Sequence, residues 1–490
     1  MSRALIAPAA LTLAALTALT ALSGCAQLPP AGNTAPPALE LPQATTAPQP
    51  VATDWWTPFN DPALSALVAE ALQNNRDLAR AVARIDESRA LLALSHSDTQ
   101  PSLTATVAGS RQRSSETTGN PNQGAATRSS LRATLNLDYE IDLWSRLAKA
   151  DAAARAELLA LSSTRDALFG VIAVQVVQAY TALQAQDEQR RLFGAAVDVQ
   201  RESLGLQRLR LNAGDIGELD MRQLEGELAA NEAQLPRLDR ARGESERALA
   251  NLLGRSPRAV IEQAIARAPQ PAVLATVTAA PTVAAAPTIA AVPAGLPSDL
   301  LQHRPDVQAA QARLAAAGAR VDAARAAYFP RIALTAALGQ ESAELSRLFE
   351  GPSLVWNLLA SATQPIWGAG RLRAQSDAER ARERIAELDY RDSVAAAFAD
   401  ARNALGARSE AAESLRLAER RATALSRAAD LTRLRFNGGE ASRLQAIEAE
   451  RASLAAQAQV ADARRAMVAT QADLLRALGG GWNAATPAER

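Results

Sequence analysis

The stretch RLRLNAGDIGELD, at Arg208–Asp220, recurs 225 residues later as RLRFNGGEASRLQ, at Arg433–Gln445. In each copy a basic and apolar segment leads into asparagine and glycine and then into acidic or polar residues. Asn212–Gly214 and Asn437–Gly439 can adopt the positive φ that ends a helix. Both stretches are therefore predicted to be sharp turns between two helices.

The residues after each turn predict the start of the next helix. Asp215 with Glu218 in the first copy, and Ser442 with Gln445 in the second, resemble a capping box. In such a box, two side chains bond the free N–H groups of a helix N-terminus.

Long helices are predicted to enter both turns. No proline occurs from about Leu143 to Leu211 or from about Gly370 to Phe436, and a helix of about 70 residues spans roughly 100 Å. After the second turn, apolar residues recur every seven positions, at Ile447, Leu454, Ala461, Val468 and Leu475. This period and the abundant alanine favour closely packed coiled-coil helices, which need no cofactor to explain them.

The turns belong to a tandem repeat. NRDLARAVARI matches RPDVQAAQARL with Asp77 aligned on Asp306, and the same shift of 229 aligns Pro101 on Pro330. A helical pattern from Asp61 to Leu94 precedes the first proline. After the prolines, SLTATVAGSRQ with SSLRATLNLDYEI, and RIALTAALGQ with SLVWNLLASATQ, alternate as strands do. Each half is predicted to be a helix, two strands, a long helix, a turn and a helix.

Four strands of about 10 to 12 residues have the length of tilted membrane β-strands. Open edges are prohibitive in hydrocarbon and membrane barrels begin at about eight strands, so several copies must share one barrel. A trimer with twelve strands and a helical tube is favoured, although a dimer with eight strands also reaches the minimum size of a membrane barrel. The polar loop at Arg111–Ser130 suits the outside of a barrel; the alternative is a soluble sheet that caps the coil.

The N-terminus indicates the compartment. In MSRALIAPAALTLAALTALTALSGC, a basic residue precedes an apolar run, which is the layout of a signal peptide and also approaches the length of a membrane anchor. Its ending, LSGC, resembles a bacterial lipoprotein box. Residues 1–24 are therefore predicted to be a lipoprotein signal peptide and Cys25, the only cysteine, to be lipidated. By resemblance to lipoprotein sorting, Ala26 at the next position favours the outer membrane.

The remaining boundaries follow from composition. Residues 25–60 are rich in proline and are predicted to form a lipidated tether. Residues 61–267 and 298–479 are the two repeats, and 480–490 form a tail. Residues 268–297 are a proline- and alanine-rich linker, because prolines at 269, 271, 281, 287 and 293 prevent a spanning helix.

Charge and composition exclude several classes of function. With 52 basic and 52 acidic residues, nothing indicates a nucleic-acid partner. Two histidines, His96 and His303, and one cysteine cannot assemble a Cys/His zinc site, and no Ser-His-Asp pattern or GxxxxGK[ST] nucleotide loop is visible. We therefore predict no enzyme, no metal and no cofactor, although an enzyme that uses aspartate or glutamate alone is formally possible.

Several segments resemble one known family. WWTPFNDPALSALVAEALQNNRDLARAVARI, YEIDLWSRL, GLPSDLLQHRPDVQAAQARLAAAGARVDAARAAYFPRIALT and the C-terminal ALGGGW follow the lipoprotein box in this order. Together they resemble the outer-membrane efflux proteins, the TolC-like family in its OprM/NodT lipoprotein branch. The likeness covers nearly the whole mature chain. Two departures are the long linker and SATQPIWGAGRL, which replaces the LDYEIDLWSRL of the first copy.

The resemblance implies a mainly α-helical homotrimer. Four β-strands per protomer would form a twelve-stranded barrel in the outer membrane, above a long α-helical barrel in the periplasm. It implies docking to a periplasmic adaptor and an RND-type inner-membrane pump. The function expected is a passive exit duct for drugs or other small toxic compounds. A lipidated periplasmic adaptor, which has one helical hairpin, and a structural coiled-coil envelope lipoprotein are the alternatives.

The resemblance also implies which residues close the duct and which residues bind the periplasmic adaptor. The periplasmic gate falls on Leu444, Gln445 and Glu448, with Leu219, Asp220 and Gln223 at the equivalent first-copy positions. Three copies of Glu448 around an axis would form a ring of like charge. The simpler alternative is that these are ordinary solvated side chains on helix surfaces. The adaptor-docking hairpin tips are Asn212, Gly214, Asp215, Asn437, Gly438, Gly439, Glu440 and Ser442.

Overall fold

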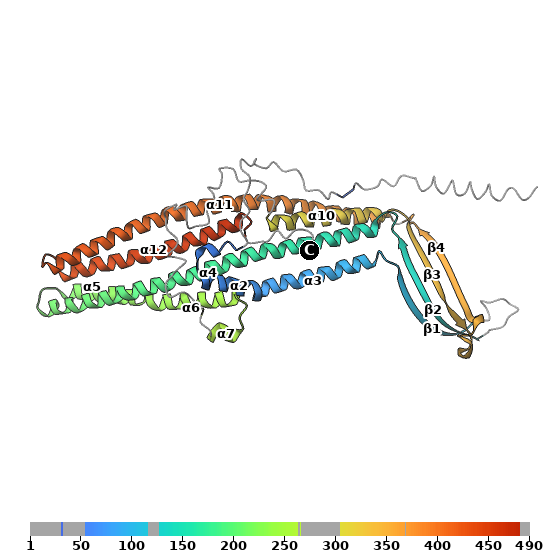
Figure 1. Cartoon of the computed structure of the whole chain (residues 1–490), viewed down its shortest axis with the longest axis horizontal. Helices are drawn as coiled ribbons and strands as arrows, with labels where there is room; N and C mark the ends of the chain where they lie inside the picture. Colours follow the sequence, from blue (N-terminus) through green and yellow to red (C-terminus); the bar gives the residue numbers. More distant parts are fainter. Residues whose placement is uncertain are drawn as a thin grey trace, which may run out of the picture. The chain divides into compact units, whose positions relative to one another are not determined.

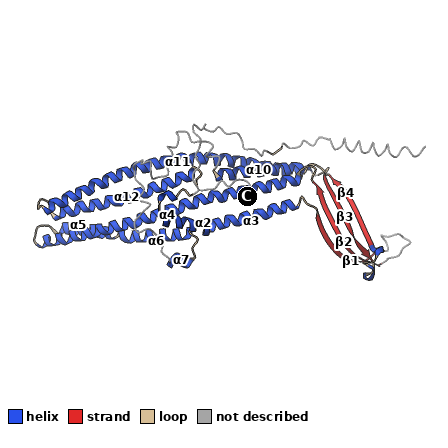
Figure 2. Cartoon of the chain, in the orientation of Figure 1, coloured by secondary structure: helices blue, strands red, loops and turns tan. Residues whose placement is uncertain are grey.

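The structure is a computed structural model that describes residues 31–32, 54–115, 127–262, 265, 304–367 and 369–480. The predicted signal peptide, the predicted lipidation site Cys25, the predicted linker 268–297 and residues 481–490 lie outside the described residues. Helix dominates the described chain, and four strands form its one sheet (Figure 2).

Two compact units make up the chain, and each takes residues from both repeats. The sheet unit comprises 1–36, 89–157 and 313–387, and the helical unit comprises 37–88, 158–312 and 388–490. Figure 1 shows the elements in chain order by colour.

The first repeat contains helices α2 and α3, strands β1 and β2, and helices α4 to α7. Their bounds are α2 Pro62–Asn74, α3 Arg76–Ser97, β1 Ser102–Arg113, β2 Thr127–Ile141, α4 Arg146–Asn212, α5 Glu218–Glu232, α6 Gln234–Leu252 and α7 Pro257–Glu262. The second repeat comprises α10 Pro305–Ala326, β3 Arg331–Ser342, β4 Leu354–Thr363, α11 Ala369–Asn437 and α12 Arg443–Ala477. Short 3-10 turns lie at Thr57–Phe59, Leu345–Arg347 and Gly351–Ser353. The predicted order of elements occurs in both copies, although two of the helices predicted for the first repeat are each divided in two.

The long proline-free segments form continuous helices. Helix α4 has 67 residues and α11 has 69, as the absence of proline predicts. Of the five residues of the seven-residue pattern on α12, Leu454 is half-buried and the other four are buried. Packing against neighbouring helices therefore explains this pattern.

The helical pattern from Asp61 to Leu94 is two helices, where the sequence predicts one. Asn75 has extended backbone angles and separates α2 from α3. Its side-chain oxygen accepts from the N–H groups of Asp77, at 2.8 Å, and Leu78, and its amide donates to the carbonyl of Leu252 at 2.8 Å. An asparagine that caps the second helix offers the backbone an alternative to continuing the first.

The helix after the first turn is also divided, although the sequence predicts one helix there. Helix α5 ends at Glu232 and α6 begins at Gln234. Pro236 has no N–H to donate to the carbonyl of Glu232, and its ring would clash with that carbonyl. The break therefore follows from one proline that the periodicity does not reveal.

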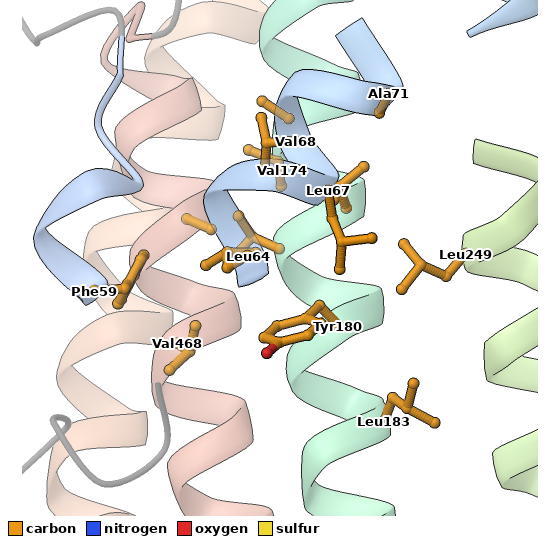
Figure 3. Packing of buried hydrophobic residues seen from close by; sticks show 14 of the residues in the cluster. Phe59, Leu64, Leu67, Val68, Ala71, Val174, Tyr180, Leu183, Leu249 and Val468 are labelled. Carbon is orange, nitrogen blue, oxygen red and sulfur yellow. The ribbon is translucent and has the colours of Figure 1, made fainter. Parts of the chain in front are cut away.

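The hydrophobic core of the helical unit lies where α2 packs against α4, α6 and α12. Figure 3 shows Leu64 and Val68 of α2 among Val174, Tyr180 and side chains of the other helices. At the start of α2, the carboxylate of Asp61 is buried. Its Oδ1 accepts from two backbone N–H groups, and its Oδ2 accepts from the Tyr180 hydroxyl at 2.8 Å. These bonds compensate the loss of hydration and fix α2 on α4.

Candidate functional site

The four strands form one antiparallel sheet in the order β1-β2-β3-β4, and its two faces differ in polarity. Register pairs place the odd residues of β1 and β2 with the even residues of β3 and β4 on one face. That face carries Leu103, Ala105, Val107, Leu135, Leu137, Tyr139, Ile332, Leu334, Leu338, Trp356 and Leu358. Val107 is 84% exposed and Trp356 is 74% exposed in the single chain. A broad apolar surface of this kind fits lipid rather than water.

The opposite face of the sheet carries most of its polar and charged side chains, and several of these form ion pairs. Arg132 on β2 contacts Glu341 on β3, with Nη2 and Oε2 2.6 Å apart. Glu140 accepts from both Arg146, at 2.8 Å, and Arg331, at 2.6 Å. Apolar residues outward and polar residues inward are the pattern of a membrane β-barrel with an aqueous lumen.

Aromatic residues lie where the strands join the helices. The rings of Trp144 and Phe329 stack with centroids 4.7 Å apart, and the Trp144 indole N–H donates to the carbonyl of Pro330 at 2.9 Å. Just after β4, Ile366 and Trp367 are 91% and 97% exposed. Tryptophan is enriched at the boundary between membrane and water, so this end of the sheet has the character of an interface.

In the helical unit, the second predicted turn has the expected caps. Gly439 adopts a φ of 79° after the end of α11. The Ser442 hydroxyl accepts from the N–H of Gln445 at 3.2 Å, and the Gln445 side chain accepts from the N–H of Ser442 at 3.0 Å. The predicted capping box of α12 is confirmed.

The first turn has a different cap from the predicted one. Gly214 adopts a φ of 83°, but α5 begins after Gly217, whose N–H donates to the Asp220 carboxylate at 3.3 Å. The predicted pairing of Asp215 with Glu218 is wrong, since Glu218 instead accepts from Arg222 at 3.2 Å. Gly217 has no side chain, so only one arm of the box is present.

The predicted docking residues are exposed. In both turns a glycine, and not the asparagine, takes the positive φ, because Asn212 and Asn437 are the last residues of α4 and α11. The eight exposed tip residues are Asn212, Gly214, Asp215, Asn437, Gly438, Gly439, Glu440 and Ser442.

The predicted gate residues differ in their surroundings. Leu444 and Glu448 are half-buried, whereas the other four are exposed, with Leu219 at 71%. Asp220 and Gln445 occupy equivalent places in the repeat and make the same bond to the N-cap N–H. The remaining exposed residue is Gln223.

Glu448 is not an isolated charge in the single chain. Its Oε2 lies 2.8 Å from Nη2 of Arg451, and Nη1 of Arg451 lies 3.8 Å from Oε2 of Glu227 on α5. Arg451 therefore partly compensates the charge of Glu448 and also links α12 to the first hairpin.

A second ion pair, which was not predicted from the sequence, links the two hairpins. Arg443, the first residue of α12, donates from Nε to Glu202 on α4 at 3.0 Å. Its guanidinium also lies 5.3 Å from the ring centroid of Phe436. Arg443 aligns with Glu218 of the first repeat, so the charge is reversed between the two copies. This reversal is the feature of the sequence that could have indicated the contact.

A buried arginine fixes the start of α10. Arg304 is 4% exposed, and its Nη2 lies 2.6 Å from Asp306 and 3.3 Å from Asp400 on α11. Its Nη1 donates to the carbonyl of Ala477, at the end of α12, at 2.9 Å. Burial lowers the pKa of Arg304, but the two carboxylates outweigh it and hold the pKa above its ordinary value. The guanidinium thus joins three helices of the second repeat.

Comparison with known proteins identifies the family. The family model described as "Outer membrane efflux protein" matches residues 67–255 and 296–480. The toluene efflux pump outer membrane protein TtgF of Pseudomonas putida is 32% identical over 437 residues, covering 88% of this chain and 86% of TtgF. Outer membrane protein OprJ of Pseudomonas aeruginosa has the same identity and coverage.

A solved structure agrees in fold. The crystal structure of CusC, described in terms of transmembrane channel formation, matches with a TM-score of 0.77 and 28% identity. The match covers 92% of this chain and 99% of CusC. With two repeats, a two-faced sheet and long helices, the chain belongs to the outer membrane efflux protein family.

Proposed function

We propose that the chain is the outer-membrane exit duct of a tripartite efflux system and works as a homotrimer. The observation that carries this proposal is the two-faced sheet, whose exposed apolar face suits lipid and whose opposite face suits water. The outer strands β1 and β4 have no further strand neighbour among the described residues. Such edges must be paired within a bilayer.

Three copies would close a barrel of twelve strands. A dimer would give eight strands, at which size side chains fill the interior. Twelve strands leave room for a lumen lined by the polar face, which passage of a drug-sized compound requires. The long helices would continue the duct into the periplasm, and the chain would conduct passively, with the energy supplied by an RND-type inner-membrane pump.

We propose that the second hairpin closes the periplasmic end. Leu444, Gln445 and Glu448 lie in the first two turns of α12, where three copies could meet around an axis. The bonds of Arg443 to Glu202 and of Arg451 to Glu227 hold this hairpin against the first one. Outward movement of α12 would break both pairs, so they favour the closed state. Leu219, Asp220 and Gln223 would be the corresponding outer-hairpin positions.

The exposed tips of the two hairpins are the proposed docking surface for a periplasmic adaptor. Each tip presents glycine and short polar side chains, which allow close approach of a partner backbone. Six such tips per trimer would surround the periplasmic mouth.

Channel formation tests the proposed function. The purified full-length protein should run as a heat-resistant trimer on a denaturing gel and conduct single-channel current in planar bilayers. Deletion of the gene should sensitise cells in a broad susceptibility panel. A protein that forms no trimer and conducts no current would instead be an adaptor or a structural lipoprotein.

Lipid attachment is tested separately. Cys25→Ser should abolish acylation and processing of the signal peptide. Normal acylation of this variant would show that the lipidation site lies elsewhere.

A further inference from the structure

The outer strands of the sheet, β1 and β4, are the edges that the proposed barrel must close. β1 has twelve residues and β4 has ten, so two copies of the chain could pair in several registers. The internal repeat favours one of these registers. This inference rests on the barrel proposed above.

Two constant offsets relate the strands of the two repeats. β1 and β3 both begin directly after a proline, so their residues correspond at a separation of 229. Ser102 pairs with Asp138 and Arg331 pairs with Thr363, so residues of β2 and β4 correspond at a separation of 225. The two hairpin turns are separated by the same 225 residues. The offset of 225 residues is therefore the same from β2 and β4 to the two hairpin turns, with no net insertion between them.

The junction of β2 with β3 is the template for a junction of β4 with β1 of a second copy. Inside the chain, Asp138 lies opposite Thr335. The two offsets convert this pair into Thr363 and Thr106. We propose that β4 of one subunit pairs antiparallel with β1 of the partner subunit, with Thr363 opposite Thr106 of the partner subunit.

This register keeps both faces of the sheet continuous. Ala362 falls opposite the partner's Val107 on the apolar face, and Ser361 opposite the partner's Ala108 on the polar face. A slip of one residue would turn the apolar residues of β1 toward the lumen. Slips of two residues preserve the faces, and only the repeat offset distinguishes them from the proposed register.

Exposed apolar side chains near the end of the junction gain partners. In the single chain Ile366 is 91% exposed and Leu103 is 65% exposed. The proposed register places Ile366 opposite the partner's Leu103, as Ile141 lies opposite Ile332 within the chain. The two contacts are equivalent in the repeat, and both pair apolar side chains on the lipid face.

The junction between subunits has no ion pair at the position where the junction within the chain has one. Arg132 and Glu341 correspond to Asn357 and the partner's Gln112. Two amides can hydrogen-bond across the strands without opposite charges having to be brought together. The junction would therefore depend less on salt than an ionic one.

One position marks a local departure from the template. A Cβ on Gly339 would lie 2.2 Å from the carbonyl oxygen of Ala133. The residue equivalent to Gly339 is Ser110, so β4 and the partner's β1 must separate slightly there. Pairs that include Ser110 are therefore unsuitable as the primary test of register.

Disulfide crosslinking in the full-length trimer tests the register. Residues directly opposite on antiparallel strands have Cβ atoms about 4.5 to 5.5 Å apart, and diagonal neighbours are farther away. Thr363→Cys with Thr106→Cys should yield covalent dimers and trimers on mild oxidation. Two-residue slips are represented by Thr363→Cys with Thr104→Cys and by Thr363→Cys with Ala108→Cys, which should crosslink several-fold less.

The controls distinguish failure of the proposed register from failure of the proposed barrel. Thr363→Cys alone tests for crosslinks through Cys25, and Asn357→Cys with Gln112→Cys repeats the test at the other end of β4. Preferential crosslinking of a slipped pair, or of neither pair in intact conducting trimers, overturns the register but leaves the exit duct standing. If the unmodified protein forms neither trimers nor channels, the proposed function fails and the register fails with it.

Discussion

Arg443 and Glu202 lie 241 residues apart in sequence and form a hydrogen-bonded ion pair that joins the two helical hairpins. Arg443 begins α12, and Glu202 lies on α4 near the tip of the other hairpin. Their side chains are 37% and 50% exposed, so water weakens the interaction. It is suited to a contact that must break and re-form.

Loss of the Arg443–Glu202 pair should favour the open duct. Exposed ion pairs contribute up to about 1 kcal/mol, so Arg443→Ala or Glu202→Ala should raise the ratio of open to closed channels by at most about fivefold per subunit. Single-channel recording measures this ratio. The charge exchange Arg443→Glu with Glu202→Arg should restore closure. Arg222→Ala, which removes ion pairs within α5 alone, should have no effect.

Removal of the Glu448 charge should reduce preference for cations. Three carboxylates near one axis attract cations even when Arg451 partly compensates them. Glu448→Ala should therefore shift the reversal potential in a KCl gradient toward zero. Glu450→Ala removes a carboxylate of the same helix that lies 3.4 Å from Arg433 of α11, and should leave selectivity unchanged. Unaltered conductance and selectivity in Glu448→Ala would show that this residue does not line the gate.

Alanine at Gly439 should destabilise the second turn through its backbone alone. Gly439 has a φ of 79°, and no atom lies within 4 Å of the Cβ that alanine would add. The expected cost is about 1 to 2 kcal/mol, the penalty of left-handed backbone for a residue with a Cβ. Thermal unfolding followed by helical circular dichroism measures it. Gly438→Ala is the matched control, because Gly438 has no positive φ. Equal losses in both variants would contradict this explanation.

Removal of the Arg304 guanidinium should destabilise the second repeat. Its bonds to Asp306, Asp400 and the carbonyl of Ala477 are charge-assisted, and losing them should cost about 2 to 3 kcal/mol. Arg304→Ala should therefore unfold at a lower temperature. Arg320→Ala, which breaks an exposed pair with Glu157, should change the unfolding temperature little.

The contribution of Arg304 should not depend on pH in the working range. Its folded pKa is raised above its ordinary value, because Asp306 and Asp400 stabilise the charged guanidinium. Stability from a raised basic pKa is fully present below the unfolded value and is lost only as pH rises through the folded one. The difference between native protein and Arg304→Ala should thus be the same in neutral and mildly alkaline buffers. A difference that shrinks with rising pH would show that another group supplies the stability.

Local patterns predicted much of the fold because they depend on neighbours along the chain. Alternation in the four strands, the long proline-free segments and the cap of Ser442 with Gln445 are each confirmed by the elements they predict. The errors arose where one residue outweighed a pattern. Asn75 ends a helix that periodicity continues, and Pro236 divides another. Gly217 is the N-cap residue of α5, where the sequence predicted Asp215.

Period-two alternation and helical periodicity could be predicted from the sequence, because each reflects the geometry of neighbouring residues in a strand or helix. The tandem repeat could be predicted because its two copies align directly. The pairs Arg443–Glu202 and Arg304–Asp400, and the partial compensation of Glu448 by Arg451, were visible only in the folded chain. Helix packing chooses which of many arginines and carboxylates meet, since a charge contributes a specific contact only when distant segments bring its partner within a few ångströms. For this reason the positions of the hairpin tips could be predicted from the sequence, whereas the contacts that hold the two hairpins together could not.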